Sequence, residues 1–176
     1  MKILIFGNLA SGKSYLAEKI QKAIPDLEYL SIDNFRRQFG NGTMEKELLA
    51  KQKFLDSINL DKSQLIEATG LGDTGEVIAK KLQQTKEFKF IIILKIPLII
   101  SLIRLKNRTW DIPYPAPPEQ AFELAETTHK IIKDNFIQIL WNGAINYIIM
   151  EVEDLNIHKV RKIICEIKRG YSDATD

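Results

Sequence analysis

The feature that most constrains the fold is a glycine-rich segment near the start of the chain. Residues 7–14 read GNLASGKS, which fits the pattern G-x-x-x-x-G-K-[ST] at every fixed position. The apolar residues 2–6 precede this segment, and a helical pattern of apolar residues follows from Lys13. The segment therefore lies between a buried strand and an amphipathic helix, as a loop that binds phosphate groups requires.

Each fixed position of this segment, which we call the phosphate loop, has a chemical reason. The glycines let the backbone wrap closely, with its N–H groups directed at phosphate oxygens. Lys13 supplies a positive charge for the β- and γ-phosphates, and Ser14 supplies a hydroxyl for Mg²⁺. We therefore expect a nucleotide to be bound by Gly7, Asn8, Leu9, Ala10, Ser11, Gly12, Lys13 and Ser14.

Strand-like and helix-like segments alternate along the whole chain. Apolar runs predict strands at residues 2–6, 29–32, 64–68, 88–96 and 145–152, with helical patterns between them, the longest at 120–140. Such alternation predicts an α/β fold, with a parallel sheet covered by helices on both faces. No repeat or linker interrupts the pattern, so residues 1–176 are expected to form a single domain.

Composition narrows the functional classes. A chain that is 45% hydrophobic and 27% charged is neither disordered nor collagen-like. Cys165 is the single cysteine, which excludes an internal disulfide and a cysteine-rich metal site. The formal net charge of +2 argues against a large, sequence-independent nucleic-acid surface. The most apolar stretch, residues 90–105, contains Lys95 and Arg104 and is a poor membrane span, so we expect a cytoplasmic protein.

Together with residues 31–37 (SIDNFRR), the phosphate loop resembles that of the P-loop kinases. The most similar group contains polynucleotide 5′-hydroxyl kinases, zeta toxins and related small kinases, and adenylate and shikimate kinases are more distant. The resemblance covers most of the chain. It implies a three-layer αβα sandwich with a five-stranded parallel sheet in the order 2-3-1-4-5, ATP and Mg²⁺ as cofactors, and a short lid at about residues 107–118.

Residues after the second and third strands are candidates for the acceptor and metal sites. Asp33 follows the second strand at the sheet edge where α/β proteins bind ligands, and it could also cap the next helix. A carboxylate there can accept the proton of a substrate hydroxyl. The resembling kinases have an Asp-x-x-Arg element that binds and activates the acceptor, and Asp33 and Arg36 match it, with Arg37 as an open neighbouring candidate. Glu67 is a candidate Mg²⁺ ligand, although this family more often has Asp; an ordinary strand-to-helix turn is the equal alternative.

Arg104 and Arg108 are four residues apart, which places them on one face of a helix. The resemblance to adenylate-kinase-like enzymes implies that such a pair begins the lid, binds the nucleotide and stabilises charge on the transferring phosphoryl group. The alternative is an exposed helix end, where the dipole favours cations anyway. Trp110 and Tyr114 follow, and plain packing is favoured for them over stacking on a base.

These observations predict an ATP-dependent kinase with an alcohol group as acceptor. Its expected catalytic residues are Lys13, Asp33, Arg36 and Arg108, with Arg104 as a further nucleotide contact and with Ser14 and Glu67 on the metal. The leading acceptor is a hydroxyl of a nucleic acid (DNA or RNA) or a nucleotide, either a 5′-hydroxyl or a hydroxymethylated base. A small-metabolite kinase for a sugar, a shikimate-like polyol or an antibiotic is the alternative, and the slight net charge supports it. A slow ATPase switch without an acceptor is a third possibility, and ATP over GTP and the oligomeric state stay open.

Overall fold

The computed structural model describes residues 1–115, 117–134, 141 and 147–173. Within these residues a five-stranded, all-parallel sheet has the order β2-β3-β1-β4-β5. This order confirms the one that the sequence implied. The strands are β1 (Lys2–Gly7), β2 (Glu28–Ser31), β3 (Gln64–Ala68), β4 (Lys89–Leu94) and β5 (Tyr147–Val152).

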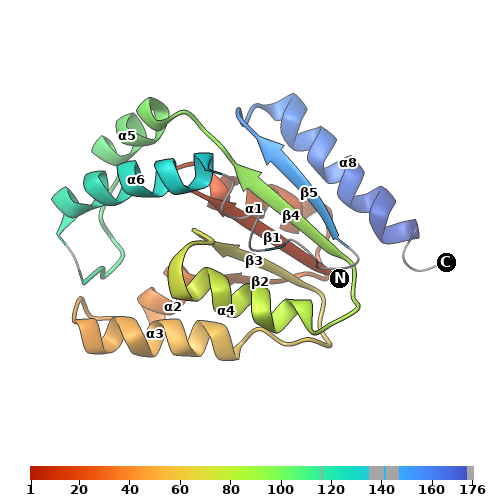
Figure 1. Cartoon of the computed structure of the whole chain (residues 1–176), viewed down its shortest axis with the longest axis horizontal. Helices are drawn as coiled ribbons and strands as arrows, with labels where there is room; N and C mark the ends of the chain where they lie inside the picture. The colour runs from red at the N-terminus through yellow and green to blue at the C-terminus, as the bar shows by residue number, and fades with distance from the viewer. Residues whose placement is uncertain (116, 135–140, 142–146, 174–176) are drawn as a thin grey trace.

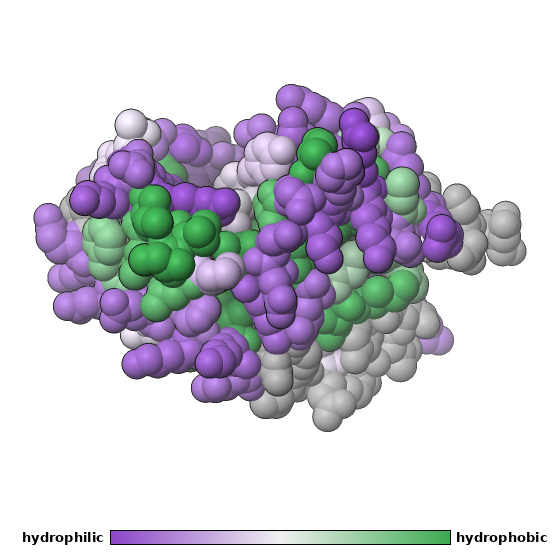
Figure 2. Space-filling model, turned by 90° about the horizontal axis from the view of Figure 1, so that it is seen from above, coloured by the Kyte–Doolittle hydropathy of each residue, from purple (hydrophilic) through white to green (hydrophobic). Residues whose placement is uncertain are grey.

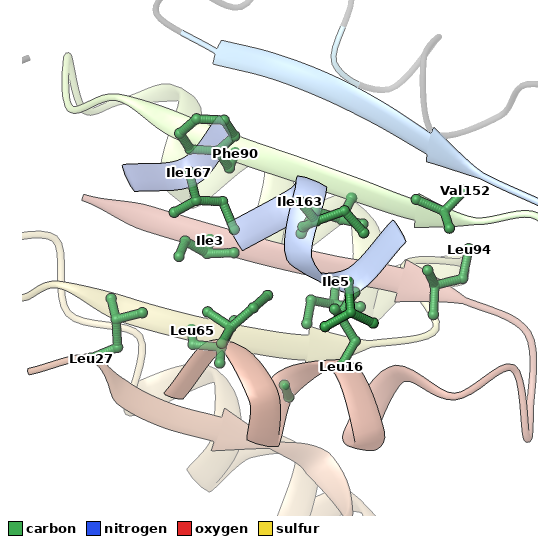
Figure 3. Packing of buried hydrophobic residues seen from close by; sticks show 14 of the residues in the cluster. Ile3, Ile5, Leu16, Leu27, Leu65, Phe90, Leu94, Val152, Ile163 and Ile167 are labelled. Atoms are coloured by element: carbon green, nitrogen blue, oxygen red, sulfur yellow. The ribbon is translucent and has the colours of Figure 1, made fainter. Parts of the chain in front are cut away.

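Both faces of the sheet are covered, because alternate residues of the central strand β1 point to opposite sides. Ile3 and Ile5 pack in one buried cluster with residues of α1 (Lys13–Ala23) and α8 (Ile157–Asp173), as Figure 3 shows for Leu16, Ile163 and Ile167. Leu4 and Phe6 pack in the second cluster, with residues of α3 (Met44–Asp56) and α4 (Gly72–Gln83). The molecule therefore has three layers, as expected (Figure 1).

Three further helices lie toward the carboxyl ends of the strands (Figure 1). They are α2 (Ile32–Phe39), α5 (Leu98–Lys106) and α6 (Pro118–Lys133), and α5 packs against α6. Helix α5 leaves Ile99, Ile100 and Ile103 exposed, and the surface seen from above has a hydrophobic area on the side where α5 lies (Figure 2). Within the described residues, no helix has both the length and the apolar character that a membrane span needs.

The structure corrects two local expectations. Ser31 is the residue that precedes α2, so Asp33 lies inside the first turn of that helix instead of capping it. An acidic residue there is still stabilised by the helix dipole. The helix expected at 120–140 begins earlier, at Pro118, because proline is well suited to the first turn. It ends at Lys133, and residues 135–140 lie outside the described part of the chain.

Candidate active site

The phosphate loop joins the central strand β1 to α1 and closes tightly on itself. Gly12 has φ +97°, and Ala10 also has a positive φ, +53°. A Cβ on Gly7 would lie 2.8 Å from Ser11 Oγ and 2.9 Å from Leu94 Cβ, so only glycine fits there. Ser11 Oγ is buried and has no hydrogen-bond partner among the described residues. A polar atom of this kind in a tight loop fits an anionic ligand such as phosphate.

Lys13 lies at the start of α1 and turns its amine back over the phosphate loop. Its Nζ donates hydrogen bonds to Gly7 O at 3.1 Å and to Asn8 O at 2.8 Å. Burial lowers the pKa of Lys13, and the carboxylates of Glu67 and Asp33 offset part of that effect. The Lys13 amine is therefore held by backbone oxygens of the same loop that is expected to bind phosphate groups.

Asn8 anchors the phosphate loop to a distant helix. Its buried side chain donates from Nδ2 to Ala125 O of α6 at 2.9 Å, and its Oδ1 accepts from the N–H of Leu9 at 2.8 Å. Asn8 occupies one of the variable positions of the motif, so the pattern gave no signal for this function. The anchor makes the shape of the loop dependent on α6.

Ser14 and Glu67 form the candidate metal site. Ser14 Oγ donates to Glu67 Oε1 at 2.9 Å, and the second carboxylate oxygen accepts from the hydroxyl of Tyr29. Burial and the charge of Glu67 raise the pKa of Tyr29, which keeps its hydroxyl protonated as a donor. No cluster of three or more His, Cys, Asp or Glu side chains suited to a metal occurs among the described residues. A hydroxyl and one carboxylate fit Mg²⁺ that takes its other ligands from phosphate and water.

Asp33 is the centre of a polar network built from two segments, α2 and the residues after α5. It accepts hydrogen bonds from Arg36 Nη1 at 2.8 Å and from Arg108 Nη2 at 3.3 Å. The hydroxyl of Tyr114 lies 2.9 Å from Oδ1 and 3.1 Å from Oδ2. Burial alone would raise the pKa of Asp33, but the charge and hydrogen bonds of Arg36 and its other partners hold it below the ordinary value. Asp33 is therefore ionised at neutral pH and accepts hydrogen bonds from all three partners.

Arg36 has a second carboxylate partner that the sequence did not reveal. Its Nε and Nη2 donate to the two carboxylate oxygens of Glu47 on α3, at 2.8 Å and 2.6 Å. Glu47 is only 4% exposed, which is unusual for a glutamate. Burial raises and Arg36 lowers the pKa of Glu47, with a net decrease. In the sequence Glu47 is indistinguishable from the exposed Glu45 of the same helix.

The expectation that Arg104 and Arg108 share one face of a helix is wrong, because α5 ends at Lys106 and Arg108 lies beyond it. The two side chains have different partners. Arg104 Nη1 donates to Ala10 O of the phosphate loop at 3.2 Å, whereas Arg108 reaches Asp33. Arg37, the alternative to Arg36, pairs with Asp111 at 3.2 Å on the surface. Of the two neighbouring arginines of α2, Arg36 is thus the one that lines the cleft.

These groups share one cleft of about 500 Å³. Its lining includes residues 9–14 of the phosphate loop with Glu67, which we call the donor end. It also includes a second group, which we call the acceptor end: Asp33, Arg36, Glu47, Lys51, Arg108 and Tyr114. Tyr114, which was expected to pack, also has a polar contact, because its hydroxyl is bonded to Asp33 inside the cleft. Trp110 does pack, edge-on against the Tyr114 ring at 6.1 Å.

Comparison with known proteins supports the fold. No family model matches the chain, and no curated protein matches it. Solved structures do: deoxyadenosine kinase from M. mycoides with bound dATP has a TM-score of 0.60 at 17% identity, over 96% of this chain and 100% of that one. Shikimate kinase from Bacteroides thetaiotaomicron has a TM-score of 0.62 at 9% identity, and the match covers 96% of this chain and 97% of that one. A gluconokinase from Sinorhizobium meliloti 1021 has a TM-score of 0.58 at 14% identity, and the match covers 96% of this chain and 91% of that one.

At these identities the likeness defines the fold, which is that of the P-loop kinases, as the sequence implied. The similar structures reported above are a nucleoside kinase and two small-metabolite kinases by their names. They give no specific support to the polynucleotide kinase group that the sequence placed first.

Proposed function

We propose that the protein is an ATP-dependent kinase that transfers the γ-phosphate to a hydroxyl of a small molecule such as a sugar, a polyol or a nucleoside. The observation that carries this proposal is the shared cleft, which is lined by both the phosphate loop and the ionised Asp33. The similarity to nucleoside and small-metabolite kinases favours this acceptor class over nucleic acid.

At the donor end, the backbone of the phosphate loop and the amine of Lys13 hold the triphosphate. The carbonyl groups that now bind Lys13 are weak partners for an ammonium group, and phosphate oxygens are stronger ones. Arg104, bonded to Ala10 O, lies beside the same loop and binds the nucleotide from outside. Ser14 and Glu67 hold Mg²⁺, which neutralises charge on the phosphates when it is bound.

At the acceptor end, Asp33 accepts the proton of the attacking hydroxyl and orients its oxygen toward the γ-phosphate. Arg36 fixes the carboxylate from within α2. Arg108 lies inside the proposed lid at residues 107–118, just beyond the end of α5, and its guanidinium is bonded to Asp33. It is therefore suited to stabilise charge on the transferring phosphoryl group.

A radiolabel experiment tests this function. The protein, Mg²⁺ and γ-labelled ATP are incubated with a panel of nucleosides, sugars, polyols and oligonucleotides, and the products are separated. We expect label in one of the small acceptors, and no transfer by Lys13→Ala. Lys22→Ala, which removes an exposed lysine of the same helix, is the matched control and is expected to be as active as the wild type. Label found only in free phosphate contradicts a kinase, and label confined to oligonucleotides contradicts a small acceptor.

A further inference from the structure

All three cations at the acceptor end of the cleft are already paired with carboxylates. Arg36 makes a two-point contact with Glu47 and a third hydrogen bond to Asp33. Arg108 pairs with Asp33 at 3.3 Å, and Lys51 Nζ lies 3.5 Å from Glu47 Oε1. A negatively charged ligand would therefore find each of these three cations already in contact with a carboxylate.

The pair formed by Arg36 and Glu47 is the firmest of these contacts. Both side chains are largely shielded from water, with exposures of 15% and 4%. The paired geometry matches the planar fork of a guanidinium to both oxygens of one carboxylate. A carboxylate or phosphate on the acceptor would meet a guanidinium whose charge Glu47 already matches, and displacing Glu47 would leave the glutamate charge buried and unpaired.

The charge count leads to the same conclusion. Three cations, Arg36, Lys51 and Arg108, face two carboxylates, Asp33 and Glu47. If Arg108 turns to the transferring phosphoryl group, as the proposed function requires, two cations and two carboxylates remain. An anionic acceptor would then enter a balanced site beside a triphosphate, where like charges repel it.

From this pairing we infer that the acceptor is uncharged, and that Glu47 determines this specificity by occupying Arg36. The inference rests on the proposed function and narrows its substrate class. Hydroxyl or amide groups suit the oxygens of Glu47 and the N–H groups that Arg36 does not use for its three bonds. Ile32, Met44, Leu71 and Pro115 add apolar lining. An uncharged sugar, polyol or nucleoside fits such a site, whereas a sugar acid or a phosphorylated compound does not.

Matched pairs of probes test this inference in the wild-type protein. Glucose is paired with glucuronate, methyl shikimate with shikimate, and each common nucleoside with its 3′-monophosphate. Binding is measured by calorimetry with Mg²⁺ and a saturating non-hydrolysable ATP analogue, which fills the phosphate loop. We expect the uncharged member of the pair that binds to have the lower Kd, by about tenfold or more.

Glu47→Gln tests the assigned residue. The variant removes the negative charge and releases part of Arg36, so the ratio of Kd values within the pair is expected to fall by about fivefold or more. Glu45→Gln makes the same change at an exposed position of α3 and is expected to leave the ratio unchanged. Circular dichroism checks the fold, and the wild-type comparison decides the acceptor class even if Glu47→Gln does not fold.

Contrary outcomes separate this inference from the function on which it rests. Tighter binding of the charged member, or label transfer to an anionic acceptor, overturns the inference and leaves the kinase function intact. An unchanged Kd ratio in a folded Glu47→Gln variant overturns the assignment to Glu47. Binding of no probe, together with no label transfer, overturns both the inference and the proposed function.

Discussion

The hydroxyl of Tyr114 lies 2.9 Å and 3.1 Å from the two carboxylate oxygens of Asp33, although the two residues are 81 positions apart. The Tyr114 ring also packs against the guanidinium of Arg36, 4.6 Å from the ring centroid. In the proposed reaction an acceptor hydroxyl has to donate to the same carboxylate. If the proposed reaction is correct, the phenol therefore competes with the acceptor for this carboxylate.

Tyr114→Phe is expected to lower the KM for the acceptor. Removing the phenol hydroxyl removes a competing hydrogen bond of about 1 kcal/mol, which corresponds to a roughly fivefold lower KM. The kcat value is expected to change little, because the phenol takes no part in phosphoryl transfer. Steady-state kinetics with varied acceptor measure both values. A higher KM in the variant would instead mean that Tyr114 binds the acceptor directly.

Asp33→Asn is expected to retain nucleotide binding and lose phosphoryl transfer. The amide keeps the shape of the side chain but cannot accept the proton, which reduces kcat by about 10²–10⁴-fold. Calorimetry with Mg²⁺ and ATP measures binding, and label transfer measures the rate. Asp26→Asn, at an exposed position after α1, is the matched control. Near-normal transfer by Asp33→Asn would remove Asp33 from the proposed mechanism.

Glu67→Gln is expected to shift the Mg²⁺ dependence of the reaction. The variant loses the carboxylate beside Ser14, so the Mg²⁺ concentration for half-maximal activity should rise by about tenfold or more. Tyr29→Phe leaves the carboxylate in place and removes only its hydroxyl partner, so a smaller shift is expected. Glu18→Gln changes an exposed residue of α1 and is the control. An unaltered Mg²⁺ titration in Glu67→Gln would exclude Glu67 from the metal site.

Stability is expected to fall in acid because of two carboxylates in the cleft. The pKa values of Asp33 and Glu47 lie below their ordinary values of 3.8 and 4.5. Both groups therefore add stability that is fully present above those ordinary values and is lost as the pH falls through the lower, folded-state values. Urea unfolding between pH 7 and pH 3 measures this effect. At pH 7 the free energy of unfolding of Glu47→Gln should be lower than that of the wild type by about 1–3 kcal/mol. As the pH falls, the variant should lose less stability than the wild type does. The prediction would be wrong if the free energy of unfolding fell with pH equally steeply in the variant and the wild type.

The parts of the site that depend on short sequence spacing were predictable. The phosphate loop is contiguous, and Asp33 and Arg36 are three residues apart on one helix, so their contact follows from helix geometry. Glu47 and Tyr114 reach the same site through tertiary packing of α3 and of the segment after α5. No local pattern distinguishes a glutamate that will be buried from an exposed one on the same helix.

The fold was predictable for a related reason. Five apolar runs separated by helical patterns leave few topologies for a parallel sheet, and the resemblance to the P-loop kinases implied the order that places the first strand at its centre. The acceptor class was harder to predict, because the phosphate loop and Asp33 specify only a phosphate donor and a hydroxyl. The rest of the acceptor is recognised by residues such as Glu47, whose partners the sequence does not reveal.

The hydrogen bond from Asn8 to Ala125 has a consequence for dividing the chain into shorter pieces. A fragment that stops before Pro118 would contain all eight residues of the nucleotide motif, with its strand and helix, yet would lack the backbone oxygen to which the buried amide is tethered. In such a fragment the Asn8 side-chain amide would lose its hydrogen-bond acceptor, and the phosphate loop would lose its contact with α6. We therefore expect such a fragment to bind a triphosphate less tightly than the whole chain does, although it contains the complete motif.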